Sequence, residues 1–319
     1  MKILVTGSAG HLGEALMRTL RDQGVDAIGL DVLPSPFTDV VGSIADRTTV
    51  AASMRGVTAV LHAATLHKPH VTSHNRQSFI DVNVTGTLNL LEEAVAQRVR
   101  AFIYTSTTST FGDALTPPRG APAAWITEDV VPIPKNIYGV TKVAAEDLCQ
   151  LFFRNESLPC LVLRTSRFFP EEDDLAERRE AYIEENLKVN ELLYRRVDIE
   201  DVVSAHLLAL DQVGKLGFGR YIISATTPFT RADAAELGRD AGRVLARYVP
   251  EYVDLFKARG WTMLPALDRV YDNELARRLL GWQPRYDFQG AVRAIAAGKD
   301  WRSPLTHAVG AKGYHRRSA

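Results

Sequence analysis

The sequence has little cysteine and no excess of either charge. Cys149 and Cys160 are the only cysteines among 319 residues, and neither has a CxxC or zinc-type spacing. Two scattered thiols are typical of a reducing compartment without a disulfide framework. The 38 Lys and Arg residues balance 38 Asp and Glu residues. This balance argues against nucleic-acid and membrane-surface partners, because such binding depends on a basic excess.

Long apolar runs are also missing. No stretch approaches the roughly 18 apolar residues of a membrane span. The opening MKILVTGSAG lacks the apolar stretch and cleavage site of a signal peptide, and leads directly into a strand and a glycine turn. We therefore expect a cytoplasmic protein with no membrane contact.

Short apolar runs alternate with helical patterns over the first two-thirds of the chain. The expected strands are 2–6, 27–31, 59–63, 101–105, 159–164 and 219–225. The expected helices between them include 11–23, 79–97, 138–153 and 199–211. This alternation predicts an α/β fold, with a Rossmann-type, doubly wound parallel sheet covered by helices on both faces.

The pattern changes after about residue 225, where helical periodicity dominates and prolines interrupt it. We expect residues 226–300, together with 165–197, to form a smaller, mainly helical substrate lobe. Residues 1–164 and 198–225 then form the nucleotide-binding domain. Residues 301–319 show no periodicity and are expected to be an irregular tail.

A glycine-rich turn follows the first expected strand, with Gly7, Gly10 and Gly13 spaced as GxxGxxG. Glycines permit a tight turn and a close approach of the backbone to a pyrophosphate, which the N-terminus of the next helix attracts. His11 and Leu12 lie in the same turn. An ordinary strand-to-helix turn also favours glycine, but the position after the first strand favours a dinucleotide site.

Asp31 ends the second expected strand, 18 residues after Gly13. A carboxylate there can accept hydrogen bonds from the adenosine ribose and would repel a 2′-phosphate. No arginine follows directly, since the next residues are Val32 and Leu33. The expected cofactor is therefore NAD rather than NADP.

Tyr138 and Lys142 form a YxxxK motif in an expected helix, where residues four apart share a face. The Lys142 charge and a positively charged nicotinamide would both favour the phenolate, so we expect the pKa of Tyr138 to move toward neutrality. The preceding strand ends in five consecutive hydroxyl residues, 105–109. Since ligands bind at the carboxyl ends of parallel strands, a hydroxyl there would hold a substrate oxygen beside Tyr138.

Together these motifs resemble the extended short-chain dehydrogenases, the NAD-dependent epimerase/dehydratase proteins that act on sugars. The resemblance covers about residues 1–290 and includes the glycine turn, Asp31, His62-Ala63-Ala64, DVNVTGT, YGVTK, VDIED and LGWQP. It implies an enzyme that binds NAD and a small-molecule substrate, and a homodimer built from the helices that bear Asn83 and Tyr138.

The resemblance also implies roles for single residues. Thr107 would orient the substrate, Tyr138 would be the acid/base, and Lys142 would hold the nicotinamide ribose. The other implied cofactor contacts are Ser43 and Ile44 near adenine, Ala63, Ala64 and Asn83. Thr108, Arg167 and His67 are candidates for contact with the substrate.

Two departures from the family pattern concern the substrate. Phe111 stands where the family usually has tyrosine, and Arg167 stands where sugar-nucleotide epimerases carry asparagine. The segment from Arg164 to Val197 is short for a lobe that holds a nucleotide. A guanidinium at position 167 could clamp a carboxylate or phosphate. The alternative is that Arg167 turns outward and pairs with Glu171 or Glu172.

Four histidines lie close together in the sequence, at 62, 67, 70 and 74. Because no carboxylate or cysteine of matching spacing accompanies them, we expect no metal site there. The expected function is hydride transfer at a carbinol carbon of a sugar, or of a sugar-like or acidic molecule, by a dehydrogenase or an epimerase. An NDP-sugar 4-epimerase with tightly held NAD is one alternative, and a catalytically silent NAD-binding sensor is another.

Overall fold

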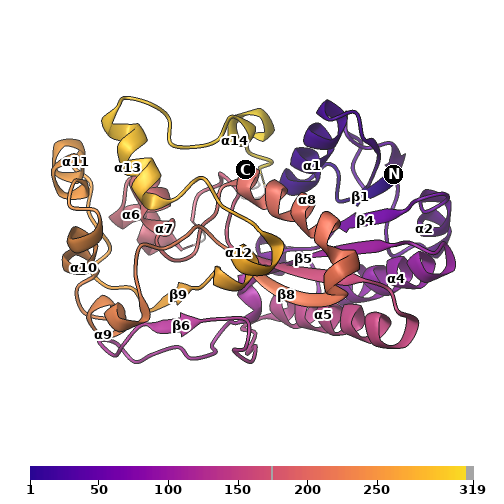
Figure 1. Cartoon of the computed structure of the whole chain (residues 1–319), viewed down its shortest axis with the longest axis horizontal. Helices are drawn as coiled ribbons and strands as arrows, with labels where there is room; N and C mark the ends of the chain where they lie inside the picture. Colours follow the sequence, from indigo (N-terminus) through magenta and orange to yellow (C-terminus); the bar gives the residue numbers. More distant parts are fainter. Residues whose placement is uncertain (174, 314–319) are drawn as a thin grey trace.

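A seven-stranded parallel sheet forms the centre of the computed structural model, which describes residues 1–173 and 175–313 (Figure 1). The strands lie in the order β3 (Val40–Val41), β2 (Asp26–Asp31), β1 (Lys2–Thr6), β4 (Ala59–His62), β5 (Ala101–Thr107), β7 (Cys160–Thr165) and β8 (Phe218–Ile223). The order reverses direction between β1 and β4, which is where doubly wound sheets bind ligands. The predicted fold class is confirmed.

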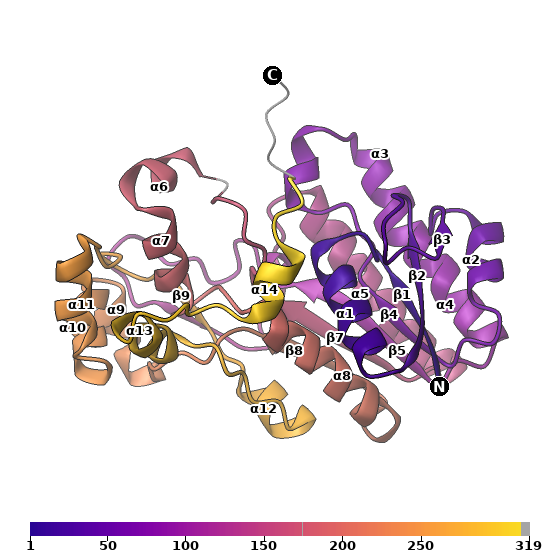
Figure 2. The same cartoon turned by 90° about the horizontal axis from the view of Figure 1, so that it is seen from above.

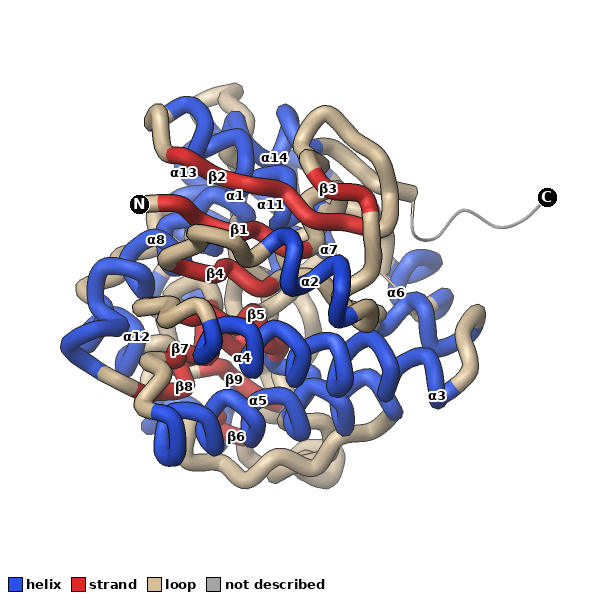
Figure 3. Tube along the Cα trace, turned by 90° about the vertical axis from the view of Figure 1, so that its right-hand side faces the viewer, coloured by secondary structure: helices blue, strands red, loops and turns tan. Residues whose placement is uncertain are grey.

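Alternate side chains of β1 pack on opposite faces of the sheet. Ile3 and Val5 belong to a core with α1 (His11–Asp22) and α8 (Ile199–Leu216), whereas Leu4 belongs to a core with α2 (Arg47–Ser53), α4 (Gly86–Ala96) and α5 (Ile137–Glu156). Figure 3 shows α4 and α5 side by side along one face. Burial on both faces explains why the strands read as continuous apolar runs.

The helix expected at 79–97 consists of three parts. A short α3 (Arg76–Phe79) leads into a π-helical turn at Ile80–Thr85 (η2), and α4 continues from Gly86. Insertions of this kind are frequent at functional sites. Here the turn buries the side chain of Asn83, which helical periodicity could not indicate.

The second lobe has its own apolar core and a small sheet. The core includes Leu193, Leu245, Phe256 and Trp261. The helices of this lobe are α6 (Ala176–Ala181), α7 (Glu184–Glu191), α9 (Ala234–Leu237), α10 (Ala241–Tyr248), α11 (Tyr252–Arg259), α12 (Glu274–Leu280) and α13 (Phe288–Ala296), of which α12 packs back onto the main sheet. β6 (Ala124–Ile126) pairs in parallel with β9 (Arg269–Tyr271).

The small sheet corrects two expectations. β9 lies in a stretch where no strand was expected, because three residues are too few for a visible alternation. β6 lies within 1–164 yet pairs with a strand of the second lobe, and Ala123 beside it belongs to the core of that lobe. The chain therefore crosses into the lobe once more than its sequence indicated.

The expectation of an irregular tail is wrong for part of residues 301–319. Residues 304–309 form α14 (Pro304–Val309), with Ser303 as its N-cap and Pro304 in its first turn. Trp301, Ser303 and Val309 are buried, and α14 contacts α1 and α8. Residues 314–319 lie outside the described residues. Along the described chain, no helix has both the length and the apolar character that crossing a bilayer requires.

Candidate functional site

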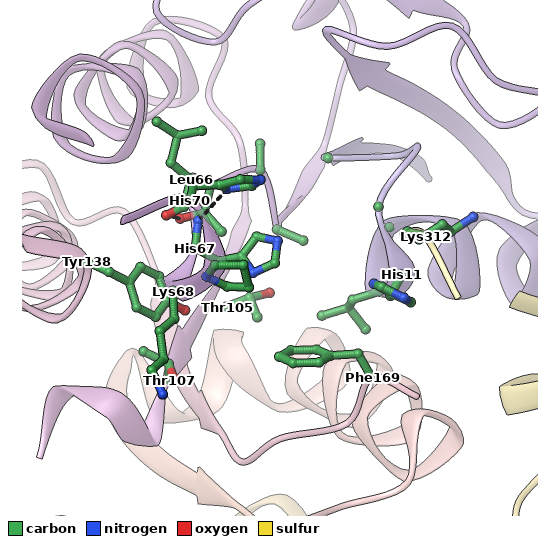
Figure 4. A pocket seen from close by; sticks show the side chains of 18 of the residues that line it. His11, Leu66, His67, Lys68, His70, Thr105, Thr107, Tyr138, Phe169 and Lys312 are labelled. Atoms are coloured by element: carbon green, nitrogen blue, oxygen red, sulfur yellow. Dashed lines mark hydrogen bonds between the residues drawn. The ribbon is translucent and has the colours of Figure 1, made fainter. Parts of the chain in front are cut away.

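A cavity of about 740 Å³ opens at the carboxyl ends of the sheet strands. It extends from Asp31, at the end of β2, to Tyr138 on α5, and Figure 4 shows the part near Tyr138. The sequence-predicted residues in its wall are Gly7, Gly10, His11, Leu12, Gly13, Asp31, Ser43, Ile44, Ala63, Ala64, His67, Thr107, Thr108, Tyr138, Lys142 and Arg167. Of the predicted set, Asn83 is missing from the wall among the described residues.

The glycine turn is held in a conformation that requires glycine. Gly7 has a φ of +76°, a region that L side chains rarely adopt, and a Cβ on it would lie 2.7 Å from the backbone nitrogen of Ala64. A Cβ on Gly13 would lie 1.9 Å from the carbonyl oxygen of Gly7. The turn thus leaves a backbone cradle at the N-terminus of α1, as a pyrophosphate requires.

The Asp31 carboxylate is fixed by backbone groups on both sides of it. Its Oδ2 accepts a hydrogen bond from the Ala9 N–H at 3.0 Å, and its Oδ1 accepts one from Leu33 at 2.9 Å. Its negative charge therefore stays at the adenosine end of the cavity. The cradle and this carboxylate together fit an extended dinucleotide with free ribose hydroxyls.

Tyr138 lies in the first turn of α5, which begins where Asn136 accepts a hydrogen bond from the Gly139 N–H at 3.1 Å. The phenol is 8% exposed and hydrogen-bonds with Thr107 at the end of β5. Burial raises the pKa of Tyr138 to about 12, although the Thr107 hydrogen bond opposes the shift. The expected shift toward neutrality is therefore wrong for the groups of the protein itself, because burial penalises the phenolate.

Lys142 lies one turn further along α5 and is buried. Its ammonium donates a hydrogen bond to the Thr105 carbonyl at 2.6 Å and lies 4.2 Å from the centre of the Tyr104 ring. Burial lowers the pKa of Lys142 to about 7, against the opposing charges of Glu146 and Cys149. Carbonyl and ring hold the ammonium beside the strand end that carries the hydroxyl residues.

Asn83 lies behind the cavity wall instead of in it. Its Nδ2 donates to the Leu66 carbonyl and to the Thr141 hydroxyl, at 2.9 and 3.0 Å. Its Oδ1 accepts from the Leu66 N–H and the Thr65 hydroxyl, at 2.8 and 3.0 Å. The amide is thereby fully bonded, and it ties the loop after β4 to α5, which bears Tyr138.

His62 continues this network beneath the glycine turn. Its Nδ1 lies 2.8 Å from the Thr6 hydroxyl and its Nε2 lies 2.9 Å from the Thr87 hydroxyl, which donates to the Asn83 carbonyl. Since the Thr87 hydrogen is used there, Nε2 carries the imidazole proton and Nδ1 accepts from Thr6. Burial lowers the pKa of His62 well below its usual value, which agrees with a neutral ring.

Aromatic and cationic side chains surround the end of the cavity near Tyr138. Phe169 lies between His11 and His67, with ring centres 5.9 and 6.0 Å away (Figure 4). The basic wall residues at this end, besides Lys142, are Lys68, Arg167 and Arg195. Phe169, Arg195, Tyr271 and Lys312 were not predicted, since no local motif marks them.

Arg167 lines the cavity and also contacts the following loop. One of its nitrogens donates to the backbone carbonyls of Glu171, at 3.0 Å, and of Glu172. The guanidinium also lies 5.0 Å from the centre of the Phe169 ring. Its partners in that loop are thus backbone carbonyls rather than the carboxylates that the outward orientation required.

The histidines of the loop after β4 pack on one another. The rings of His67 and His70 have centres 4.5 Å apart, and those of His70 and His74 lie 5.2 Å apart. The His70 Nδ1 accepts a hydrogen bond from the His67 backbone N–H at 3.1 Å. Over residues 1–173 and 175–313, no group of three or more His, Cys, Asp or Glu side chains has an arrangement that could hold a metal ion.

Comparison with known proteins places these features in a family. A model of the NAD dependent epimerase/dehydratase family matches residues 3–223. A UDP-glucose 4-epimerase of Lactobacillus helveticus is 25% identical over 350 aligned positions, covering 97% of this chain and 99% of that protein. An uncharacterised protein of Sinorhizobium fredii is 31% identical over 166 positions, which are half of this chain but only 39% of that protein.

Solved structures show the same fold. A short-chain dehydrogenase/reductase superfamily protein from Agrobacterium tumefaciens with bound NAD has a TM-score of 0.66 and 24% identity, and covers 93% of this chain and 96% of that one. Because the family model matches most of the chain, and the cavity carries a glycine cradle and a ribose carboxylate, the cofactor is NAD. The chain is thus an NAD-dependent enzyme that belongs to the NAD dependent epimerase/dehydratase family.

Proposed function

We propose that the protein is an NAD-dependent oxidoreductase or epimerase that acts on a carbinol carbon of a sugar-like, anionic substrate. One observation carries the proposal: Tyr138, hydrogen-bonded with Thr107, lines the same cavity as the glycine cradle and a group of cationic side chains. The cavity therefore combines a dinucleotide site, a proton-transfer group and charges that attract an anion.

Bound NAD would supply the hydride acceptor for a substrate alcohol. Thr107 would hold the substrate oxygen next to the Tyr138 phenol, which takes the hydroxyl proton during oxidation and returns it during reduction. With a pKa of about 12, Tyr138 is protonated at neutral pH and is suited to donate a proton to a carbonyl oxygen. Lys142 is placed to hold the ribose and to supply the positive charge that phenolate formation needs.

The same groups serve a dehydrogenase and an epimerase. They differ in whether the substrate ketone leaves or is reduced again on its other face. A dehydratase also needs a carboxyl group beside the substrate-orienting hydroxyl. Thr108 and Ser109 occupy those positions here. The only carboxylates in the described cavity wall are Asp31, at the far end, and Asp173, which pairs with Arg195. We therefore do not assign dehydration.

The charge of the wall favours an anionic substrate. Asp173 accounts for one negative charge near Tyr138, whereas Lys68, Arg167 and Arg195 account for three positive ones. Arg195 also pairs with the buried Glu191, so its charge is partly used. Arg167 is the best placed to receive a carboxylate or phosphate, since a guanidinium offers two parallel donors.

Substitution of Arg167 by lysine tests this substrate class. We expect the KM for sugar acids or sugar phosphates to rise about tenfold, because a point charge cannot reproduce a bidentate contact. Turnover at saturation should change little. NADH formation would be followed at about 340 nm over a panel of sugar acids, sugar phosphates and UDP-sugars, with Arg119→Lys as the matched surface control. Good activity on a UDP-sugar that Arg167→Lys leaves unchanged would refute an anion contact at this position.

A sugar-nucleotide 4-epimerase is a second candidate function. It is favoured by the alignment with the Lactobacillus helveticus UDP-glucose 4-epimerase, which extends over nearly the whole of both chains. A silent NAD-binding sensor is disfavoured, because such a protein has no physical reason to keep Thr107, Tyr138 and Lys142 together. A homodimer through α4 and α5 remains part of the proposal, and Val140 and Leu151 of α5 are exposed.

Asp31 should make the protein prefer NAD to NADP. At 4 Å, a carboxylate and a phosphate charge repel by roughly 1–4 kcal/mol, so we expect NAD to bind at least about tenfold more tightly. Asp31→Ser should narrow this difference, because it removes the charge. Dissociation constants would be measured by calorimetry, with Asp26→Ser, at the amino end of the same strand, as the control. Equal affinities of the unmodified protein for both cofactors would contradict the assignment.

A further inference from the structure

Residues 301–313, here called the C-terminal strap, run between the two lobes. Figure 2 shows α14 between the helical lobe and the sheet domain. The Ser303 N–H and the Thr306 hydroxyl both donate to Oδ2 of Asp198, at 3.0 and 3.1 Å. Asp198 also caps α8, where its Oδ1 accepts from the Glu200 N–H. The strap is thus anchored on the helix that covers one face of the sheet.

Beyond α14, the strap reaches the N-terminus of α1. The Lys312 backbone N–H donates to Oε1 of Glu171 at 2.8 Å, and the same oxygen lies 2.9 Å from Nε2 of His11. The Lys312 ammonium pairs with Glu14, also on α1. We call this set the clasp: His11 and Glu14 of α1, Glu171 of the loop after β7, and Lys312 of the strap.

The clasp lies at the pyrophosphate end of the cofactor cradle. His11 and Lys312 both line the cavity with Gly7, Gly10 and Gly13. Two positions before Glu171, Phe169 lies against His11 and extends toward His67 (Figure 4). Phe169 and Lys312 are therefore held in one wall by the same loop and the same helix end.

The charges of the clasp also matter to a bound phosphate. Burial raises the pKa of Glu171, but the hydrogen bond and charge of His11 outweigh it and lower the pKa to about 2, so this carboxylate is ionised at neutral pH. Glu14 and Glu171 would both repel a pyrophosphate at the helix end. The Lys312 ammonium balances one of them, and its backbone N–H bonds the other.

We propose that the C-terminal strap is part of the dinucleotide site, and that the Lys312–Glu171–His11 clasp retains bound NAD. The strap closes the wall at the pyrophosphate end and neutralises carboxylates that would otherwise weaken the cofactor's hold. The cofactor must then leave through a wall that opens only when the clasp breaks. This inference rests on NAD as the cofactor and is independent of the substrate proposed above.

The release rate of NADH tests the proposal without any substrate. NADH fluorescence would be followed after the loaded protein is mixed with excess NAD. We expect a chain that ends at Gly310 to release NADH about tenfold faster or more, with weaker affinity, because such changes act mainly on dissociation. Lys312→Ala should accelerate release by a smaller factor, and Lys312→Arg should restore the parental rate.

Two controls separate retention from folding. Arg302→Ala alters the same strap, but its hydrogen bonds are with Asp300 nearby, so we expect the parental rate. The midpoint of thermal unfolding without cofactor shows whether each variant is folded. Parental release from a folded chain that ends at Gly310 would overturn the proposal. Should that chain not fold, parental release from Lys312→Ala would overturn it instead.

Discussion

Replacing Tyr138 by phenylalanine is expected to lower turnover by about 10²–10⁴-fold, the usual contribution of a positioned acid or base. The affinity for NAD should stay nearly unchanged, because the ring keeps its place in the first turn of α5 and only the hydroxyl is lost. Turnover would be measured at saturating cofactor and substrate, and NAD affinity by calorimetry. The two measurements together distinguish lost chemistry from a damaged cofactor site.

Tyr104→Phe is the matched control for this substitution. Tyr104 is also a buried tyrosine next to Lys142, but its hydroxyl has no hydrogen-bond partner among the described residues. Its ring, which faces the ammonium, is kept in the variant. We expect turnover close to that of the unmodified protein. Full activity of Tyr138→Phe would show that another group moves the proton.

Gly13→Ala is expected to weaken NAD binding at least about tenfold and to destabilise the protein by about 1–3 kcal/mol. The added Cβ would lie 1.9 Å from the Gly7 carbonyl oxygen and 2.8 Å from the Ser8 Cα. Both are backbone atoms of the turn, so relief requires the cradle itself to move. Affinity would be measured by calorimetry and stability by thermal unfolding.

Gly214→Ala controls for the loss of a glycine as such. Gly214 lies within α8, and a Cβ there would have no heavy atom within 4 Å. Because alanine favours helix over glycine by about 1 kcal/mol, this variant should be slightly stabilised, with parental NAD affinity. A Gly13→Ala protein that binds NAD as tightly as the parent would contradict the role given to the cradle.

The titration behaviour of the Tyr138–Lys142 pair could not be predicted from the motif. Spacing places both residues on one face of a helix, and that much is local. The direction of each pKa shift depends on how deeply the tertiary structure buries the two groups. Burial moves the pKa of Tyr138 up to about 12 and that of Lys142 down to about 7, so both neutral forms are favoured.

Local patterns were sufficient for the sheet and for most of the cavity wall. Continuous apolar strands, the glycine turn, Asp31 and the YxxxK helix are each contained within a few consecutive residues. A doubly wound sheet then brings the ends of its strands to one edge, whatever the details of packing. This is why sixteen of the seventeen predicted site residues line a single cavity.

The exception, Asn83, shows where local patterns stop. Its position near the site follows from the motif that contains it, but a π-helical turn and four hydrogen bonds decide that it supports the wall from behind. Three of those bonds reach residues 17 or 18 positions away, and the fourth reaches Thr141, 58 positions away.

By itself, the sequence determined the fold class, the cofactor and the place of Tyr138 and Lys142, because each depends on short-range periodicity or spacing. Only the tertiary structure decided the pairing of β6 with β9, the helical tail and the clasp. Lys312 meets Glu171 and Glu14 across 141 and 298 positions of chain, and no local pattern encodes such contacts. They arise because packing brings the end of the chain onto the helix that begins at the glycine turn.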